Sequence, residues 1–122
     1  MARHIVIIDD DATVLDALGD IMGSMGHQVS TFRDPVVGEE YALANDFDLL
    51  LLDLHMPDRS GADIAKDVLR KRPDACVLLI TGDVADPRVR DAIDSGVRDV
   101  VRKPFEIGVV LDYLKNPIGG AG

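Results

Sequence analysis

The sequence predicts an α/β domain: a doubly wound, five-stranded parallel sheet with helices on both of its faces. Four short apolar runs have the length and composition of buried parallel strands. They occupy residues 5–8, 49–52, 77–80 and 97–102. Segments with apolar residues at helical spacing separate these runs, which is the pattern of alternating strands and helices. Because the chain has only 122 residues, the short strand order 2-1-3-4-5 suits it better than the longer doubly wound order.

The first half of the chain is expected to supply an inner strand, an edge strand and two helices. After the strand at residues 5–8, apolar residues recur at helical spacing, and Gly26 provides a stop. These residues are Val14, Leu15, Leu18, Ile21, Met22 and Met25, and both methionines are expected in the core. Residues 27–32 have modest β character and fit an edge strand. Asp34 and Pro35 then provide the N-cap and the first position of a second helix.

The second half of the chain repeats the alternation of strands and helices. The run at residues 49–52 contains no polar residue, as expected for a central strand. An amphipathic helix follows it and ends before Pro73. A shorter helix is expected at about residues 87–95, with Gly96 as its stop, and the last helix should end at Asn116–Pro117. The two amphipathic helices carry Ile64, Ala65, Val68 and Leu69, and Ile107, Val110, Leu111 and Leu114.

The chain has the size of one domain, and its 47% of hydrophobic residues is enough for a packed core. We expect the domain to span residues 1–116, and residues 117–122 to form a flexible tail or the start of a linker. No apolar run approaches the ~20 residues of a membrane span, and no secretory signal precedes the first strand. The single Cys76 is expected to be a small buried hydrophobe, which fits a reducing, cytoplasmic location.

The charge of the chain excludes one class of partner. There are 22 acidic and 13 basic residues, and the net charge is −9. Such an acidic surface repels the phosphates of nucleic acids. We therefore expect no direct nucleic-acid binding by this segment, and no membrane partner.

Polar side chains follow four of the five predicted strands, at the points where those strands end. They are Asp9 and Asp10 after the first strand, Asp53 after the third, Thr81 after the fourth and Lys103 after the fifth. Open α/β sheets bind ligands beyond the carboxyl ends of their strands, at the switch point of the strand order. For the predicted order, this point lies between the strands that end in Asp10 and Asp53. We therefore expect all five side chains to share one pocket.

Three carboxylates in one pocket need a cation. Two like charges ~4 Å apart repel by roughly 4 kcal/mol at an effective dielectric constant of about 20. Hard oxygen ligands select Mg²⁺, with Mn²⁺ as the alternative. A carboxylate beside such an ion can attack phosphorus and form an aspartyl phosphate. Lys103 would then pair with the phosphoryl oxygens, Thr81 would donate a hydrogen bond to one of them, and Gly82 would leave room for the donor.

Five motifs, in order along the chain, resemble those of one known family. The motifs are Ile-Ile-Asp9-Asp10-Asp11, Leu-Leu-Asp53-Leu-His-Met-Pro57, Gly61, Thr81-Gly82 and Lys103-Pro104-Phe105. Over about residues 3–116, the chain resembles the receiver domain of response regulators, the phospho-acceptor module of two-component signal transduction and phosphorelays. The resemblance implies a flavodoxin-like fold. It also implies that the protein is not an enzyme for other substrates and catalyses only its own phosphorylation and dephosphorylation.

The resemblance implies a phosphorylation site with a bound cation. Asp53 would take the phosphoryl group from a histidine kinase or a phosphotransfer protein. Asp10 would bind Mg²⁺ directly, Asp9 would help through a water molecule, and the main-chain carbonyl of His55 would supply a third protein oxygen. Asp11 is instead expected to cap the first helix.

The resemblance also implies a switch. Thr81 would be the switch hydroxyl and Lys103 the phosphate-pairing lysine, followed by a cis peptide bond to Pro104. His55 and Asp83 would flank the phosphoryl group and modulate its hydrolysis. One hypothesis is that the His55 imidazole makes the phosphoryl lifetime sensitive to pH, and the alternative is a solvent-exposed loop histidine.

Val100 departs from the pattern of the resembled family. Many members have Tyr or Phe at this place in the fifth strand, and that ring turns inward upon phosphorylation. A valine side chain cannot report in this way. We therefore expect the signal to pass through Thr81 and the loop after the fourth strand. It would reach an output surface formed by the fourth helix, the fifth strand and the last helix.

Three other functions are the alternatives. A haloacid-dehalogenase-like phosphohydrolase also uses a strand-end aspartate, but it usually needs a second Asp where this chain has His55. A flavodoxin-like FMN carrier needs a loop that binds phosphate through backbone N–H groups, and residues 9–11 would repel phosphate. An unphosphorylated pseudo-receiver would act through interactions alone. We expect a receiver segment of a longer regulator with an output domain, and the sequence leaves a phosphorylation-dependent homodimer open.

Overall fold

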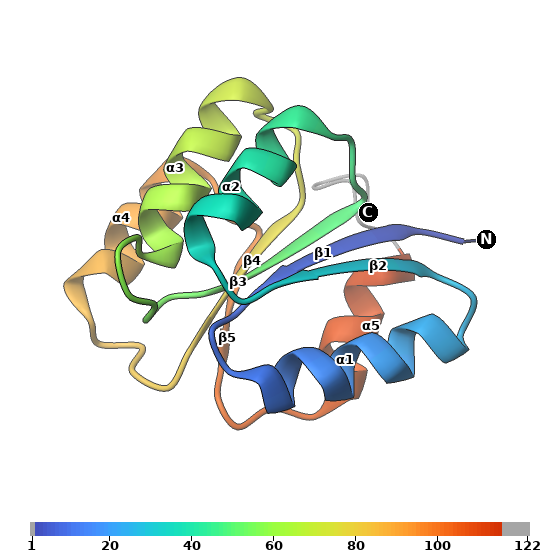
Figure 1. Ribbon diagram of the computed structural model, residues 1–122. Coiled ribbons are helices and arrows are strands. Elements are labelled where there is room, and N and C mark those ends of the chain that lie inside the picture. Colours follow the sequence, from blue (N-terminus) through green and yellow to red (C-terminus); the bar gives the residue numbers. More distant parts are fainter. Residues whose placement is uncertain (1, 116–122) are drawn as a thin grey trace.

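The computed structural model describes residues 2–115, which form one parallel sheet between two layers of helices (Figure 1). The strands are β1 (His4–Ile8), β2 (Gln28–Phe32), β3 (Leu49–Asp53), β4 (Val77–Thr81) and β5 (Asp99–Arg102). All strand pairings are parallel, and the strand order is β2-β1-β3-β4-β5. The predicted fold class and strand order are confirmed.

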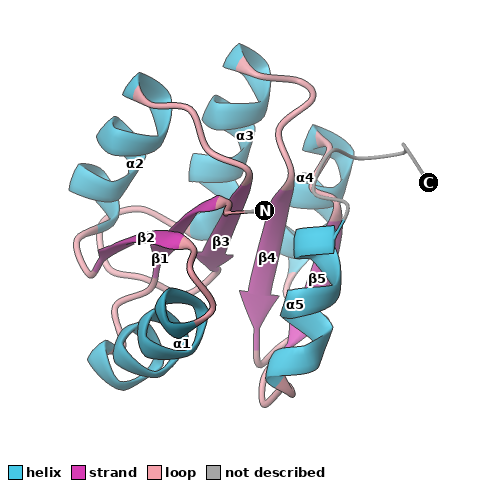
Figure 2. Cartoon of the chain, turned by 90° about the vertical axis from the view of Figure 1, so that its right-hand side faces the viewer, coloured by secondary structure: helices cyan, strands magenta, loops and turns pink. Residues whose placement is uncertain are grey.

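Each strand of the described chain is followed by a helix. The helices are α1 (Ala12–Ser24), α2 (Pro35–Ala44), α3 (Gly61–Lys71), α4 (Pro87–Ser95) and α5 (Ile107–Lys115). Helices α1 and α5 cover one face of the sheet, and α2, α3 and α4 cover the other (Figures 1 and 2). This division follows from right-handed crossovers on either side of the point where the strand order reverses.

Two hydrophobic clusters, one on each face of the sheet, form the core. Leu50 and Leu52 of β3 pack with residues of α2, α3 and α4, whereas Leu49 and Leu51 pack with residues of α1 and α5. All four leucines are fully buried. Successive side chains of a strand point to opposite faces, so a strand covered on both faces is apolar throughout. The run of leucines places β3 at the centre of the molecule and Asp53 at the end of that central strand.

Two helices begin after a capping aspartate and one ends at a glycine, at the positions that the sequence predicted. The Asp11 carboxylate accepts the N–H of Thr13 at 2.9 Å, and the Asp34 carboxylate accepts the N–H of Val36 at 2.9 Å. Gly96 ends α4 with a φ of 106°, a left-handed conformation that favours glycine. Asp11 is thus a helix cap, as predicted.

Two details of the elements differ from the predictions. Met22 is fully buried as expected, but Met25 is 52% exposed. Helix α1 ends at Ser24, so Met25 is its C-cap and has left the helical stripe that faces the sheet. Strand β5 is shorter than predicted and begins at Asp99, because Val97 still belongs to the turn that closes α4.

Three further predictions concern the end of the chain, the single cysteine and membrane spans. The predicted end of the last helix and the tail at residues 117–122 lie outside the described residues. Cys76 is buried just before β4, as expected for a small hydrophobe. Within residues 2–115, no helix combines the length and the apolar character that crossing a bilayer requires.

Candidate functional site

The sheet brings the predicted pocket residues together at the carboxyl ends of its strands. Asp9 directly follows β1, Asp53 and Thr81 end β3 and β4, and Lys103 directly follows β5. Asp9, Asp53 and Thr81 are buried although they are polar. Carboxylate oxygens of Asp9, Asp10 and Asp53 lie within 4.8 Å of one another. The site therefore lies at the switch point between β1 and β3, as the strand order requires.

Lys103 forms a bridge between two of these carboxylates. Its Nζ donates to Asp9 Oδ2 at 3.1 Å and to Asp53 Oδ1 at 3.4 Å. The Lys103 backbone N–H donates to the Thr81 carbonyl at 2.8 Å, which ties the lysine to the end of β4. The peptide bond from Lys103 to Pro104 is cis. The Lys103 ammonium therefore lies between the carboxylates of Asp9 and Asp53.

Burial and charge shift the pKa of both partners. Burial is the largest cause that raises the pKa of Asp53 from 3.8 to about 6, and the negative charge of Asp9 is the second. The positive charge of Lys103 opposes this shift. Burial alone would lower the pKa of Lys103, but the charges of Asp53 and Asp9 outweigh it and raise that pKa. Asp53 is therefore an electrostatically unfavourable carboxylate that an added cation would stabilise in its ionised form.

The donor set fits a divalent cation of the hard type. In the described part of the chain, no hydrogen bond or ion pair reaches the Asp10 carboxylate; only the Asp10 carbonyl accepts, from Arg33 Nε at 3.4 Å. Asp9 Oδ1 accepts the N–H of Asp11 at 2.9 Å, which orients the Asp9 carboxylate. Asp10 and the second oxygen of Asp53 are thus available to a cation, and carboxylate oxygens are the ligands that Mg²⁺ and Mn²⁺ prefer.

The Thr81 hydroxyl is fully buried and is engaged by the loop that follows β4. Its Oγ1 accepts the N–H of Asp83 at 3.0 Å and donates to the Asp83 carbonyl at 3.3 Å. A Cβ placed on Gly82 would meet no atom within 4 Å, so the space around this glycine is open. The hydroxyl therefore links the pocket to the loop that leads into α4.

Gly61 allows α3 to begin directly against the end of β3. A Cβ at this position would lie 2.3 Å from the Asp53 carbonyl oxygen, closer than any side chain can approach. The Gly61 N–H donates to the Leu54 carbonyl at 3.1 Å, and the side chain of Ser60 caps α3 by accepting from Asp63 N–H at 3.2 Å. The first turn of α3 thus packs directly against the main chain of Asp53 and Leu54.

The His55 ring contacts the start of α4. Its Nε2 lies 3.0 Å from Asp86 Oδ2, and the ring is 46% exposed. Asp86 is the N-cap of α4 and also accepts from the Arg88 side chain at 2.9 and 3.1 Å. Arg88, and to a smaller extent His55, hold the pKa of Asp86 well below its usual range. The sequence analysis missed this partner, although Asp86-Pro87 repeats the cap-and-proline pattern of Asp34-Pro35.

An apolar groove adjoins the pocket on the side of α1. It has a volume of about 490 Å³ and lies between α1 and the segment that links β5 to α5. Val14, Leu18 and Ile21 line it from α1, and Pro104 and Phe105 line it from the other side, next to Lys103. The groove and the Asp53 pocket therefore share a rim at Lys103.

A doubly wound sheet with three aspartates and a lysine at its switch point defines the class of receiver-type signalling domains. The family model described as "Response regulator receiver domain" matches residues 5–115. The chain belongs to this family, whose members are the response regulators of two-component systems. Response regulators pair with histidine kinases, and many carry an output domain.

Named relatives agree with this assignment. The chain is 32% identical over 114 residues to the phosphoglycerate transport system transcriptional regulatory protein PgtA of Salmonella typhimurium, covering 93% of this chain and 28% of PgtA. A CheY-like receiver domain protein from Methanospirillum hungatei has the same fold, with a TM-score of 0.88 at 23% identity over 94% of this chain and 92% of that one. The beryllofluoride-activated DrrB receiver domain gives a TM-score of 0.80 at 28% identity, covering 96% of this chain and 97% of that one.

The curated relatives are longer than this chain. It spans 28% of PgtA, 50% of DltR from Streptococcus agalactiae and 44% of SaeR from Staphylococcus aureus. The similarity to these regulators is therefore a similarity to their receiver part.

Proposed function

We propose that this domain accepts a phosphoryl group on Asp53 from a phosphohistidine of a histidine kinase or a phosphotransfer protein. The observation that carries the proposal is the setting of Asp53, a buried carboxylate with Lys103 Nζ at 3.4 Å and two further aspartates beside it. An oxygen of Asp53 forms the new bond to phosphorus while the P–N bond of the donor breaks. The imidazole nitrogen of the donor keeps the electron pair of that bond.

The neighbours of Asp53 supply charge and hydrogen bonds. Lys103 pairs with the phosphoryl oxygens in place of the carboxylates that it bridges now. The Thr81 hydroxyl exchanges its long contact with the Asp83 carbonyl, 3.3 Å, for a phosphoryl oxygen. Asp10, Asp53 and the His55 carbonyl would hold Mg²⁺ or Mn²⁺, with Asp9 assisting through water. When bound, the cation would neutralise charge on the phosphoryl oxygens.

The only reactions that we assign to the domain are its own phosphorylation and dephosphorylation. Water attacks phosphorus, the bond from the Asp53 oxygen to phosphorus breaks, inorganic phosphate leaves with the oxygen of the water, and the carboxylate is restored. A phosphohydrolase of the haloacid-dehalogenase type would need a general acid at position 55, but the His55 ring contacts Asp86 instead. His55 and Asp83 modulate the phosphoryl lifetime in this scheme, and the pH sensitivity of that lifetime stays a prediction.

The apolar groove beside Lys103 is where we place the phosphodonor protein. The donor histidine must reach Asp53, and a protein that does so covers the rim that the groove shares with the site. Burial of the exposed apolar side chain of Ile21 would favour that association.

The output surface in this proposal comprises α4, β5 and α5. The contacts of Thr81 with Asp83 connect the pocket to the loop before α4. Val84, Ile93 and Val109 are exposed large hydrophobic residues in that loop, α4 and α5. A phosphorylation-dependent homodimer or an output domain of a longer chain would use this surface, since Val100 offers no aromatic ring to signal the change.

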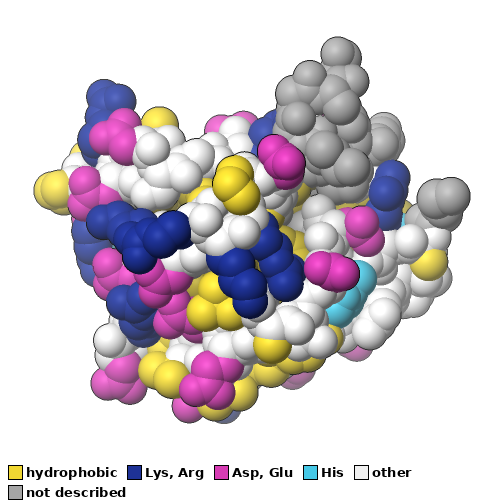
Figure 3. All heavy atoms as spheres, turned by 90° about the horizontal axis from the view of Figure 1, so that it is seen from above, with side chains coloured by type: hydrophobic (Ala, Val, Ile, Leu, Met, Phe, Trp, Pro, Cys, Tyr) yellow, Lys and Arg dark blue, Asp and Glu magenta, His cyan; other side chains and the backbone are white. Residues whose placement is uncertain are grey.

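We propose a cytoplasmic location and no direct nucleic-acid contact by this segment. The reduced, buried Cys76 fits a cytoplasmic location. The net charge of −9 disfavours nucleic acid, and the face seen in Figure 3 carries basic side chains interspersed with acidic ones.

Incubation with acetyl phosphate and Mg²⁺, followed by intact-mass measurement, tests the acceptor role. The wild-type chain should gain one phosphoryl group and Asp53→Asn should gain none. Asp58→Asn is the matched control, because it removes a carboxylate from the loop after the acceptor at a position whose φ of 68° asparagine tolerates. A wild-type chain that stays unmodified, and does not bind beryllofluoride with Mg²⁺, would support the pseudo-receiver instead.

A further inference from the structure

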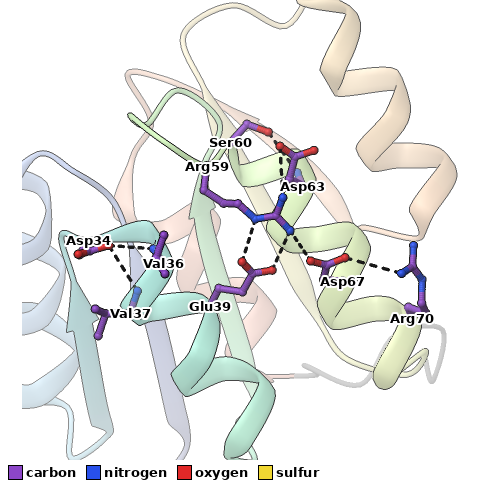
Figure 4. A network of polar contacts seen from close by, with 9 residues as sticks. All are labelled: Asp34, Val36, Val37, Glu39, Arg59, Ser60, Asp63, Asp67 and Arg70. Atoms are coloured by element: carbon purple, nitrogen blue, oxygen red, sulfur yellow. Dashed lines mark hydrogen bonds and ion pairs between the residues drawn. The ribbon is translucent and has the colours of Figure 1, made fainter.

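Arg59 is the centre of an ion-pair network outside the pocket (Figure 4). Its Nε and Nη2 donate to the two oxygens of Glu39 at 2.9 and 3.0 Å, which is a bidentate pair. Nη2 also contacts Asp67, and Nη1 lies 3.7 Å from Asp63. One guanidinium in the loop between β3 and α3 therefore joins α2 to α3.

The network makes Arg59 hard to replace. Three carboxylates surround it, and Glu39 is only 12% exposed. The hydrogen bonds that Arg59 donates to Glu39 raise the pKa of Arg59 against the opposing effect of burial. Arg70 also contacts Asp67, at 3.9 Å, but its side chain is 74% exposed and reaches only its own helix. Loss of Arg59 would leave mutually repelling carboxylates between the two helices.

The loop that carries Arg59 begins immediately after the acceptor. At its inner end, Gly61 lies against the Asp53 carbonyl, and the Gly61 N–H holds the Leu54 carbonyl. At its outer end the chain turns through Asp58, whose φ is 68°. Among residues 55–59, the side chains that form ion pairs within the described part of the chain are those of His55 and Arg59. His55 reaches toward α4 and Arg59 toward α2 and α3.

We propose that Arg59 is a positioning residue for the phosphorylation site. Its ion pairs fix the loop against α2 and α3, so the main chain from Asp53 to His55 keeps the geometry that a divalent cation needs. This inference rests on the proposed function, because it assigns Arg59 a role in cation binding by the same site. Partners outside the ligand shell commonly set metal affinity in this way.

A role limited to joining α2 and α3 is the competing explanation. In that case, loss of Arg59 would lower the stability of the fold and leave the Mg²⁺ dependence of the site unchanged. In the positioning role, the Mg²⁺ concentration that half-saturates the site would rise even under conditions where the variant is fully folded.

Beryllofluoride binding, followed by ¹⁹F NMR at increasing Mg²⁺ concentration, separates the two roles. Arg59→Ala should raise the half-saturating Mg²⁺ concentration by about tenfold. Arg59→Lys should fall between Arg59→Ala and wild type, because an ammonium cannot form the bidentate pair with Glu39. Arg70→Ala is the control: it removes the same charge from the other end of the network and should shift the value by less than about twofold.

Hydrogen exchange and thermal unfolding of the same variants, without Mg²⁺, provide a readout that does not depend on the loaded site. Faster exchange at residues 55–59 of Arg59→Ala is expected. An unchanged Mg²⁺ dependence together with a lower Tm would overturn the proposal. Should Arg59→Ala not fold, Glu39→Gln loosens the same anchor with less charge imbalance, and an unchanged Mg²⁺ dependence there would overturn it too. Failure of the wild-type chain to bind beryllofluoride would instead contradict the proposed function.

Discussion

At the scale of single residues, the sequence predicted which side chains lie in the pocket, but it did not predict the contacts that the surrounding loop residues make. Asp9, Asp53 and Lys103 were predictable because each follows its own apolar run, and the topology of a parallel sheet brings such ends together. The contact of His55 with Asp86 joins positions 31 apart, and that of Arg59 with Glu39 joins positions 20 apart. No periodicity relates these side chains, and only the packing of the loops determines which charged groups meet.

The raised pKa of Asp53 makes a prediction about stability. The pKa of Asp53 is about 6 in the folded chain, whereas the ordinary value for an aspartate is 3.8. Between these values the folded state binds more protons than the unfolded state, so the free energy of unfolding falls as pH rises from about 4 to about 6. Asp53→Asn should therefore stabilise the cation-free protein at about pH 7.5, by up to about 3 kcal/mol.

Urea unfolding without Mg²⁺ measures this effect at two pH values. The gain of Asp53→Asn should shrink at about pH 4.5, because Asp53 is then mostly protonated in the folded wild-type chain and no longer carries a buried charge. Asp58→Asn serves as the control and should show little gain at either pH. A stabilisation of the same size at both pH values would contradict the electrostatic explanation.

At the scale of elements, most helices begin and end where the capping and stop residues predicted. The C-terminal carbonyls of α2, however, accept hydrogen bonds from side chains at the end of a neighbouring helix. Helix α2 has no basic residue in its last turn. Lys71 and Arg72, at the end of α3, donate to the carbonyls of Leu43 and Asn45 instead, and the Arg72 guanidinium lies 5.6 Å from the centre of the Phe47 ring. Met25 shows the converse: a helical spacing does not predict burial once the helix has ended.

Arg72→Ala should therefore destabilise the fold through α2 rather than α3. Loss of a charged donor from carbonyls at a helix C-terminus, together with lost packing on a ring, should lower the free energy of unfolding by about 2 kcal/mol. The exposed Arg70→Ala should change it by less than about 0.5 kcal/mol. Urea denaturation of both variants compares them, and equal values would contradict the assignment.

At the scale of the whole molecule, one strand reversal determines where chemistry can occur. The strand order reverses between β1 and β3, and carboxylate oxygens of the three aspartates at the carboxyl ends of these strands lie within 4.8 Å of one another. The fold and the pocket were therefore predictable together, because both follow from the strand order. The loops that surround the pocket were not, since their conformations depend on individual contacts such as those of Thr81 with Asp83.

Cation binding should be measurable as a gain in stability of the entire domain. A ligand that binds only the folded state stabilises it by about 1.4 kcal/mol for each tenfold rise in concentration above its Kd. The Tm of the wild-type chain should rise with Mg²⁺ in this way, and Asp10→Asn should lose most of the rise. Asp58→Asn should keep it. An equal response of Asp10→Asn and wild type would place the cation elsewhere.

The close approach of Gly61 to the Asp53 carbonyl has a practical consequence. Because the first residue of α3 touches the Asp53 carbonyl, with no space for a methyl group between them, we expect any displacement of the end of β3 to move the start of α3 with it. A spectroscopic label attached on the outer side of α3, for example at the exposed position of Arg70, should therefore follow the main chain of Asp53 from a distance. Such a label would report on the proposed phosphorylation site without entering it.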